Sequence, residues 1–294
     1  MHTNQRPTDS ERTIGDFGHQ WTTYKDNTGY YGSADFFADI WGPLRSEMTV
    51  EGSRVADIGA GTGRFVNILL DAGVDHVIAI EPSDAMSVLK ANTAKGQDRI
   101  TYLHVTGDQI PADSALDYVF AIGVLHHIPD PLPLLRAARA ALKPGGCCFA
   151  WIYGSEGNRL YIRLVSALRV LATRAPHSVL VMMVWLLYGP LRIYVAAARV
   201  LPLPLRHYMT QVLGKLNGSK IRLVIYDQLN PTHAEYYNRE QVISLFTQAG
   251  YQPVHLHHRH GYSWAVKAVN PVRTPRTPPS PSTESEGLAD EESL

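Results

Sequence analysis

Three carboxylates stand within or just after short apolar stretches in the first half of this 294-residue chain, where buried strands are expected to end. Asp57 lies in the first stretch, Glu81 follows the second, and Asp108 follows the third. A carboxylate at a strand end can accept hydrogen bonds from two neighbouring hydroxyls, and it attracts a cation. The three acids therefore favour a ligand with hydroxyls and positive charge over a phosphate.

A glycine-rich turn follows the first of these acids, with the sequence Asp-Ile-Gly-Ala-Gly-Thr-Gly-Arg from Asp57 to Arg64. Glycines between a strand and a helix let the backbone approach a ligand closely. The dinucleotide fingerprint requires a third glycine three residues after the second. This chain has Arg64 at that position and its third glycine at Gly63, so the turn does not predict a dinucleotide site.

The elements that must position these residues alternate between strand-length apolar runs and helix-length amphipathic segments. We predict strands at 54–58, 76–80, 101–105, 116–123, 146–153, 252–260 and 262–268. Helices are predicted at 63–72, 84–92, 133–142 and 238–249. Because helices separate the first five buried strands, these strands should form right-handed crossovers in a parallel sheet. The predicted fold class is α/β, with a doubly wound, mostly parallel sheet.

The spacing Asp-x-Gly-x-Gly-x-Gly resembles motif I of the class I S-adenosylmethionine-dependent methyltransferases. Within that class, the chain resembles the methyltransferase type 11-like family. Four further elements of that family follow in order: Glu81 with Pro82, Gly107 with Asp108, the loop 123–130, and the Leu-Lys-Pro-Gly-Gly segment at 142–146. The resemblance covers about residues 54 to 153. It implies a Rossmann-like, seven-stranded sheet, which here carries a helical insertion after the fifth strand.

The same resemblance implies S-adenosylmethionine as the cofactor and methyl transfer as the reaction. In this family a carboxylate at the position of Glu81 accepts both ribose hydroxyls, and an acid at Asp108 meets the adenine amino group. Asp57 stands where the cofactor's ammonium group would pass, and opposite charge is favourable there. The cofactor-binding residues implied are Asp57, Gly59, Gly61, Gly63, Glu81, Pro82, Asp108, Gln109 and Gly123.

Two adjacent histidines are the candidates for catalysis. His127, with His126 as second choice, lies on the loop after the fourth strand, beside the expected methyl position. A histidine there could remove a proton from a weakly acidic acceptor during an in-line methyl transfer. The alternative interpretation is that both residues simply pack against or cap the loop.

Two segments rich in aromatic residues are candidates for the substrate wall. Trp21, Tyr24 and Tyr30 precede the first strand and could form a lid over the cofactor, or a helix packed on the sheet edge. Asp227, His233 and Tyr237 precede the last helix. The histidine-rich run 255–260 offers only two side chains on each face of a strand, so we expect no metal site.

The formal net charge of zero conceals a division along the chain. Residues 157–226 contain ten Lys and Arg but no Asp or Glu, so the rest of the chain carries 17 cations against 27 acids. Residues 175–191 carry no charge but are too short and too interrupted by Pro and Gly to predict a membrane span. Three interpretations remain open: a cap over a hydrophobic substrate, a peripheral membrane contact, or a homodimer interface.

We therefore divide the chain by sequence into six parts. These are a disordered N-terminus at 1–13, a lid at 14–53, the cofactor-binding core at 54–156, the basic insertion at 157–226, the last helix and hairpin at 227–270, and a disordered tail at 271–294. The expected function is methylation, on oxygen or carbon, of a small or lipid-like acceptor. Alternatives are a soluble natural-product or sugar acceptor, and a non-catalytic scaffold that recruits a partner. We expect no nucleic-acid partner and a cytoplasmic protein that contacts the inner face of the membrane.

Overall fold

The computed structural model describes residues 8–173 and 175–272, which fold around a seven-stranded sheet. The strand order is β3-β2-β1-β4-β5-β7-β6, and only β7 runs antiparallel to its neighbours. This confirms the predicted doubly wound, mostly parallel sheet. The strands are β1 (Arg54–Ile58), β2 (His76–Ile80), β3 (Ile100–Leu103), β4 (Leu116–Ile122), β5 (Leu142–Tyr153), β6 (Val254–Arg259) and β7 (Ser263–Val269).

Helices cover both faces of the sheet, because apolar side chains of the strands point alternately to either side. On one face α5 and α10 bury Leu135 and Phe246 against the strands, and on the other α2 and α3 bury Trp41 and Phe65 against Phe120. The helices of this part are α1 (Asp9–Thr23), α2 (Ala34–Trp41), α3 (Arg64–Asp71), α4 (Met86–Asn92), α5 (Leu132–Ala141) and α10 (Arg239–Gln248).

Short 3-10 helices connect several of these elements. They are η1 (Tyr30–Gly32), η2 (Gly42–Glu47), η3 (Ala94–Arg99), η4 (Gly107–Gln109), η5 (Leu125–His127) and, further along the chain, η6 (Leu213–Lys215). Two of them, η4 and η5, follow the third and fourth strands directly and carry residues of the candidate site.

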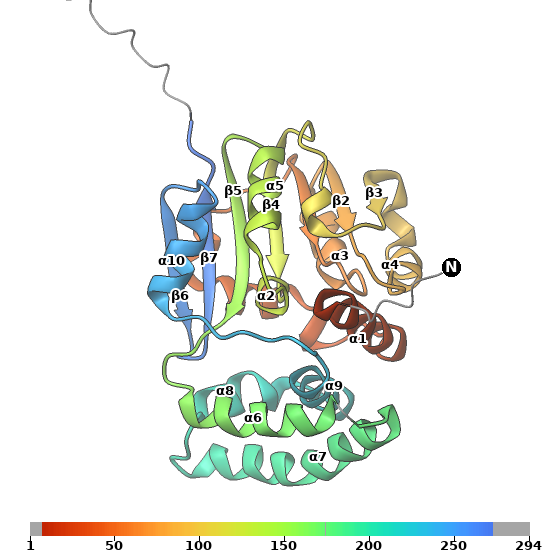
Figure 1. The fold of residues 1–294 in the computed structure, drawn as a ribbon, viewed down its shortest axis with the longest axis vertical. Coiled ribbons are helices and arrows are strands. Elements are labelled where there is room, and N and C mark those ends of the chain that lie inside the picture. Colours follow the sequence, from red (N-terminus) through yellow and green to blue (C-terminus); the bar gives the residue numbers. More distant parts are fainter. Residues whose placement is uncertain (1–7, 174, 273–294) are drawn as a thin grey trace, which may run out of the picture.

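The insertion forms a separate helical layer beyond the end of β5 (Figure 1). Its helices are α6 (Arg159–Ala172), α7 (His177–Val200), α8 (Arg206–Gln211) and α9 (Gly218–Leu229). They bury a core of their own, to which Val184, Val195, Ile221 and Ile225 contribute. The division by sequence ended the insertion at residue 226, which lies inside α9. Because α9 continues to Leu229, the helical layer extends three residues beyond that boundary.

The N-terminus differs from the expectation of disorder at 1–13. Helix α1 begins at Asp9, and Thr8 and Glu11 form a capping box that satisfies amides of its first turn. Residues 1–7 of that segment, and 273–294 of the expected tail, lie outside the described residues.

Candidate active site

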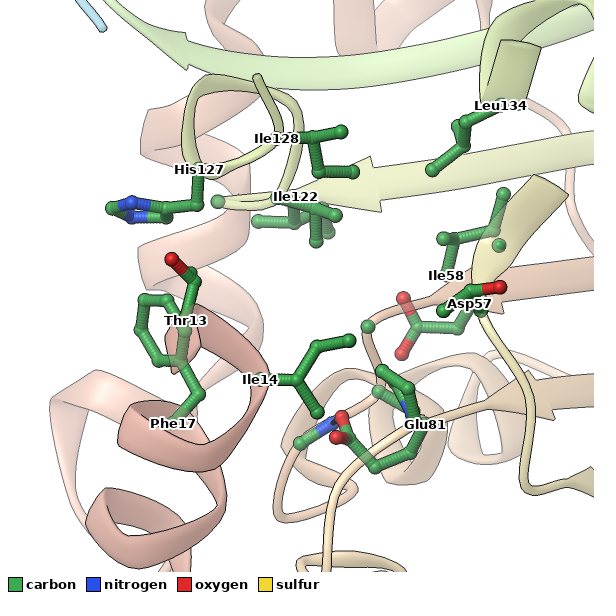
Figure 2. A pocket seen from close by; sticks show the side chains of 18 of the residues that line it. Thr13, Ile14, Phe17, Asp57, Ile58, Glu81, Ile122, His127, Ile128 and Leu134 are labelled. Atoms are coloured by element: carbon green, nitrogen blue, oxygen red, sulfur yellow. Dashed lines mark hydrogen bonds between the residues drawn. The ribbon is translucent and has the colours of Figure 1, made fainter. Parts of the chain in front are cut away.

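A cavity of about 330 Å³ opens at the carboxyl ends of β1, β2 and β4. The sheet's direction of winding reverses between β1 and β4, and ligands of open α/β sheets bind at such a point. Figure 2 shows Asp57, Glu81 and Ile122 on the sheet side of this cavity. Thr13, Ile14 and Phe17 of α1 face them from the other side, so α1 forms a lid over the strand ends.

The glycine turn brings the backbone close to its neighbours at three positions with positive φ. A Cβ on Gly59 would lie 2.5 Å from Cγ2 of Val124, and one on Gly63 would lie 2.7 Å from Cγ2 of Thr93. A Cβ on Gly61 would lie 3.3 Å from Nε1 of Trp21, so the indole of the lid rests on the turn. Gly59 and Gly61 line the cavity, whereas Gly63 caps α3.

Asp57 is buried at the bottom of the cavity. Its side chain is hydrogen-bonded to no other residue that the structure describes, and burial raises its pKa to about 8, although the Arg64 cation lowers it. A buried carboxylate without partners is costly, and a bound cation would relieve that cost. This arrangement fits a cofactor that carries both an ammonium and a sulfonium group.

Glu81 is also buried, and its two oxygens are anchored differently. Oε2 accepts a hydrogen bond from the Gly61 amide at 2.8 Å, while Oε1 accepts from the Ser83 amide at 3.0 Å and from the Ser83 hydroxyl. Burial raises its pKa, and these hydrogen bonds oppose that rise. The carboxylate is therefore held in one orientation at the cavity wall. Pro82, Asp108 and Gly123 line the same cavity.

Gln109 does not line the cavity. It is exposed, and its side-chain amide donates to the Thr106 hydroxyl within η4. Both side chains of this short turn are exposed, but only Asp108 lies on the cavity wall, which the linear sequence does not reveal.

The two histidines have different surroundings. His127 lines the cavity, and its Nδ1 lies 2.9 Å from the carbonyl oxygen of His233. Since a carbonyl only accepts, Nδ1 carries the proton and Nε2 keeps its lone pair. Burial lowers the pKa of His127 to about 4, although Asp227 raises it, so the ring is neutral at pH 7.

His126 lies behind this ring, outside the cavity. It is fully buried and stacks on Tyr153 at a centroid distance of 3.7 Å, and its ring nitrogens hydrogen-bond to none of the described residues. Burial lowers its pKa well below the usual value. His126 therefore packs against the site, and His127 is the histidine that reaches it.

The aromatic candidates separate in the same way. Trp21 and Asp227 line the cavity. Tyr24 instead packs edge-on against Tyr226, and Tyr30 packs against Phe36. The side chains of His233 and Tyr237 do not line the cavity either. The His233 carbonyl accepts from His127, and the buried Tyr237 donates to Glu235. The high density of polar aromatic residues in these two segments therefore did not predict which side chains line the cavity.

Asp227 joins the three parts of the site. Its Oδ1 accepts from Nε2 of Gln20 in the lid at 2.9 Å, and its Oδ2 accepts from the Tyr153 hydroxyl of β5 at 3.0 Å. Asp227 itself belongs to α9 of the insertion. One carboxylate therefore ties the lid and the insertion to the sheet.

A second cavity, of about 120 Å³, lies between the sheet and the insertion and was not foreseen from the sequence. Five residues line both cavities: Tyr31, Arg64, Trp151, Tyr153 and Asp227. Its other walls include Tyr161 and Tyr208 of the insertion, in addition to Tyr236 and Tyr262. Burial raises the pKa of Tyr208 to about 12 and that of Tyr161 well above its usual range, so these phenols are neutral donors. No local spacing in the sequence links these tyrosines.

Among the residues that the structure describes, no group of three His, Cys, Asp or Glu side chains is placed to hold a metal ion.

Comparison with known proteins agrees with this geometry. A family described as methyltransferase domain matches residues 56–148. The ubiquinone biosynthesis O-methyltransferase of Hydrogenovibrio crunogenus is 26% identical over 168 residues, covering 54% of this chain and 64% of the relative. A tRNA U34 carboxymethyltransferase of Methylococcus capsulatus is 31% identical over 126 residues, covering 41% of this chain and 39% of the relative. The chain thus spans less than two thirds of the length of these relatives.

A solved structure shows the same fold. It is described as a complex between the Haloferax volcanii Trm112 methyltransferase activator and the putative methyltransferase, with a TM-score of 0.52 and 15% identity over 87% of this chain and 98% of that one. The family match lies on the strands, the glycine turn and the acids that surround the first cavity. Residues 56–148 of this chain therefore form a methyltransferase domain, for which S-adenosylmethionine is the cofactor.

Proposed function

We propose that the whole chain methylates a small, flat, hydroxyl-bearing acceptor of lipid-like character, held in the second cavity with its hydroxyl reaching past the shared wall into the first cavity, which His127 lines. S-adenosylmethionine, when bound, supplies an electrophilic methyl group. Asp57, Glu81, Asp108 and the glycine turn would hold it in the first cavity. The observation that carries the proposal is the wall shared by both cavities, because it would bring two ligands side by side.

His127 supports an oxygen acceptor over a carbon one. Its ring is neutral, its Nδ1 is fixed by the His233 carbonyl, and its Nε2 is free to accept a proton from a hydroxyl. Removing that proton makes the oxygen a stronger nucleophile. The names of the ubiquinone biosynthesis relatives point to the same chemistry, on an acceptor that this chain need not share.

The lining of the second cavity supports a flat and partly apolar acceptor. Tyrosine rings offer faces for stacking and hydroxyls for hydrogen bonds, and Leu205, Met209 and Leu216 of the insertion add an apolar side. The proposed location is the cytoplasm, with the insertion in contact with the inner face of the membrane.

The test is incubation of the purified chain with methyl-labelled S-adenosylmethionine and fractionated cell extract. We expect label in a solvent-extractable product, as a methyl ether by mass spectrometry. His127→Ala should bind the cofactor in calorimetry but form the labelled product about 1000-fold more slowly. Label only in water-soluble products would exclude a lipid-like acceptor, and cofactor binding without any labelled product would favour the scaffold.

A further inference from the structure

The insertion exposes apolar side chains that a soluble surface would ordinarily bury. Among the described residues, ten large hydrophobic side chains are exposed, and nine of them lie between residues 164 and 201. These nine are Leu164, Val170, Leu171, Met182, Trp185, Leu186, Ile193, Val200 and Leu201. The tenth, Val272, lies after the last strand. Exposed apolar residues gathered in this way mark an interaction surface.

Helix α7 carries the centre of this surface. Met182, Leu186, Ile193 and Val200 recur at helical spacing and therefore share one face, with Trp185 beside them. Leu180, Val184, Val195 and Ala198 lie on the opposite face and are buried in the insertion's core. Figure 1 shows α7 as the layer of the insertion farthest from the sheet, so no element among residues 8–173 and 175–272 covers its outer face.

Cations flank this apolar stripe. Arg192 and Arg199 are exposed along its edge, seven residues apart and thus on one side of the helix. The guanidinium of Arg222 lies 4.4 Å from the centre of the Trp185 ring. No acid occurs between residues 157 and 226 to neutralise these charges.

We propose that the outer face of α7 docks in the plane of an anionic lipid bilayer, its apolar stripe between the acyl chains and its arginines at the headgroups. The charge complementarity selects the occupant. A second copy of this chain would bring the same arginines into opposition, without acids to pair them. Aliphatic side chains such as Leu186 and Ile193 distinguish this face from an RNA-binding one, which would combine cations with aromatic rings that stack on bases.

Helix α7 is long and apolar enough to cross a membrane by length and composition. Its inner face, however, packs against Ile221 and Ile225 of α9, and a spanning helix would have to leave that cluster. A helix lying in the interface keeps this packing and still buries the outer stripe. The inference rests on the insertion alone and stands whether or not the proposed methyl transfer is correct.

The experiment is sedimentation of the full chain with phosphatidylcholine vesicles, with and without phosphatidylglycerol. We expect binding to the anionic vesicles at low salt and loss of binding at high salt. The double variant Leu186→Glu/Ile193→Glu should not sediment, whereas Val272→Glu, an equally exposed apolar residue outside the insertion, should bind as the parent does. Arg192→Gln/Arg199→Gln should weaken binding by a factor on the order of 25, from about fivefold for each cation.

Unchanged S-adenosylmethionine binding by calorimetry would show that each variant is folded. Equal binding by parent and Leu186→Glu/Ile193→Glu, or no binding to anionic vesicles at low salt, would overturn the proposal. So would a dimer in sedimentation velocity that the same double variant abolishes, or tRNA binding that competes with the vesicles and ignores the apolar substitutions.

Discussion

In the core of this protein three polar side chains of functional interest are buried, whereas in the insertion large apolar ones are exposed. Asp57, Glu81 and His127 lie out of solvent at the strand ends, and Leu186 and Ile193 face outward on α7. Both arrangements cost stability, and such departures from the usual distribution mark sites of function. The contrast is consistent with the division proposed above, in which the core holds the cofactor and the acceptor and the insertion docks on a membrane surface.

The largest expected effect tests the core through His127. His127→Ala should reduce the methylation rate about 1000-fold, because the acceptor hydroxyl would lose its proton acceptor. Cofactor affinity in calorimetry should stay within about twofold, because His127 is not among the residues proposed to hold the cofactor. The hydrogen bond described for its imidazole is to the His233 carbonyl. The buried His126→Phe variant is the comparison, and it should retain most of the rate. An equal rate loss in both variants would make His127 structural.

The next largest effect concerns Glu81. Glu81→Gln should weaken S-adenosylmethionine binding about 100-fold, because charge-assisted hydrogen bonds are lost and one oxygen becomes a donor. Titration calorimetry measures this directly. Glu51→Gln, at an exposed acid near the start of β1, should bind the cofactor normally. Normal binding by Glu81→Gln would show that the core acids do not hold the cofactor.

A third effect follows from the buried Asp57. Its folded-state pKa is about 8 against an ordinary value near 4, so the folded protein keeps a proton that the unfolded chain releases. Stability of the ligand-free protein should therefore fall as pH rises from about 6.5 to 8, by about 1 kcal/mol per pH unit. The pKa of His127 is lowered to about 4 in the folded protein, so this residue makes stability rise with pH, but only below about pH 6.5.

Urea unfolding at a series of pH values measures this slope. Asp57→Asn should flatten it and raise stability at pH 8, while abolishing most cofactor binding. If the pH dependence of stability persists in Asp57→Asn, another titrating group causes it.

The smallest effect tests the insertion by two identical substitutions on one helix. Val184→Ala, at a side chain that is 1% exposed, should cost about 1.5 kcal/mol of unfolding free energy. Val200→Ala, at 79% exposed, should change it by less than about 0.5 kcal/mol. Thermal and urea unfolding distinguish the two, and equal losses would mean that the outer face of α7 is covered.

Local sequence patterns predicted the core well because each element there is specified by its own residues. The glycine turn and the apolar runs of β1, β2 and β4 have fixed spacing, and their order along the chain sets the parallel sheet. The capping box of Thr8 and Glu11 is equally local, and it could have placed the start of α1 at Asp9 instead of a disordered segment. Local patterns could not show that Trp21 lines the cavity and that Tyr24, Tyr30 and Tyr237 do not, because the direction in which each side chain points depends on tertiary packing.

The sequence by itself determined the sheet, the acids at its strand ends, and the charge and apolar composition of the insertion. It did so because backbone geometry and periodicity act over a few neighbouring residues. Only the tertiary structure decided that Asp227 meets Gln20 and Tyr153, residues 207 and 74 positions away in the chain. It alone also decided that tyrosines from distant segments enclose a second cavity and that one face of α7 remains uncovered, because such contacts depend on how whole elements pack.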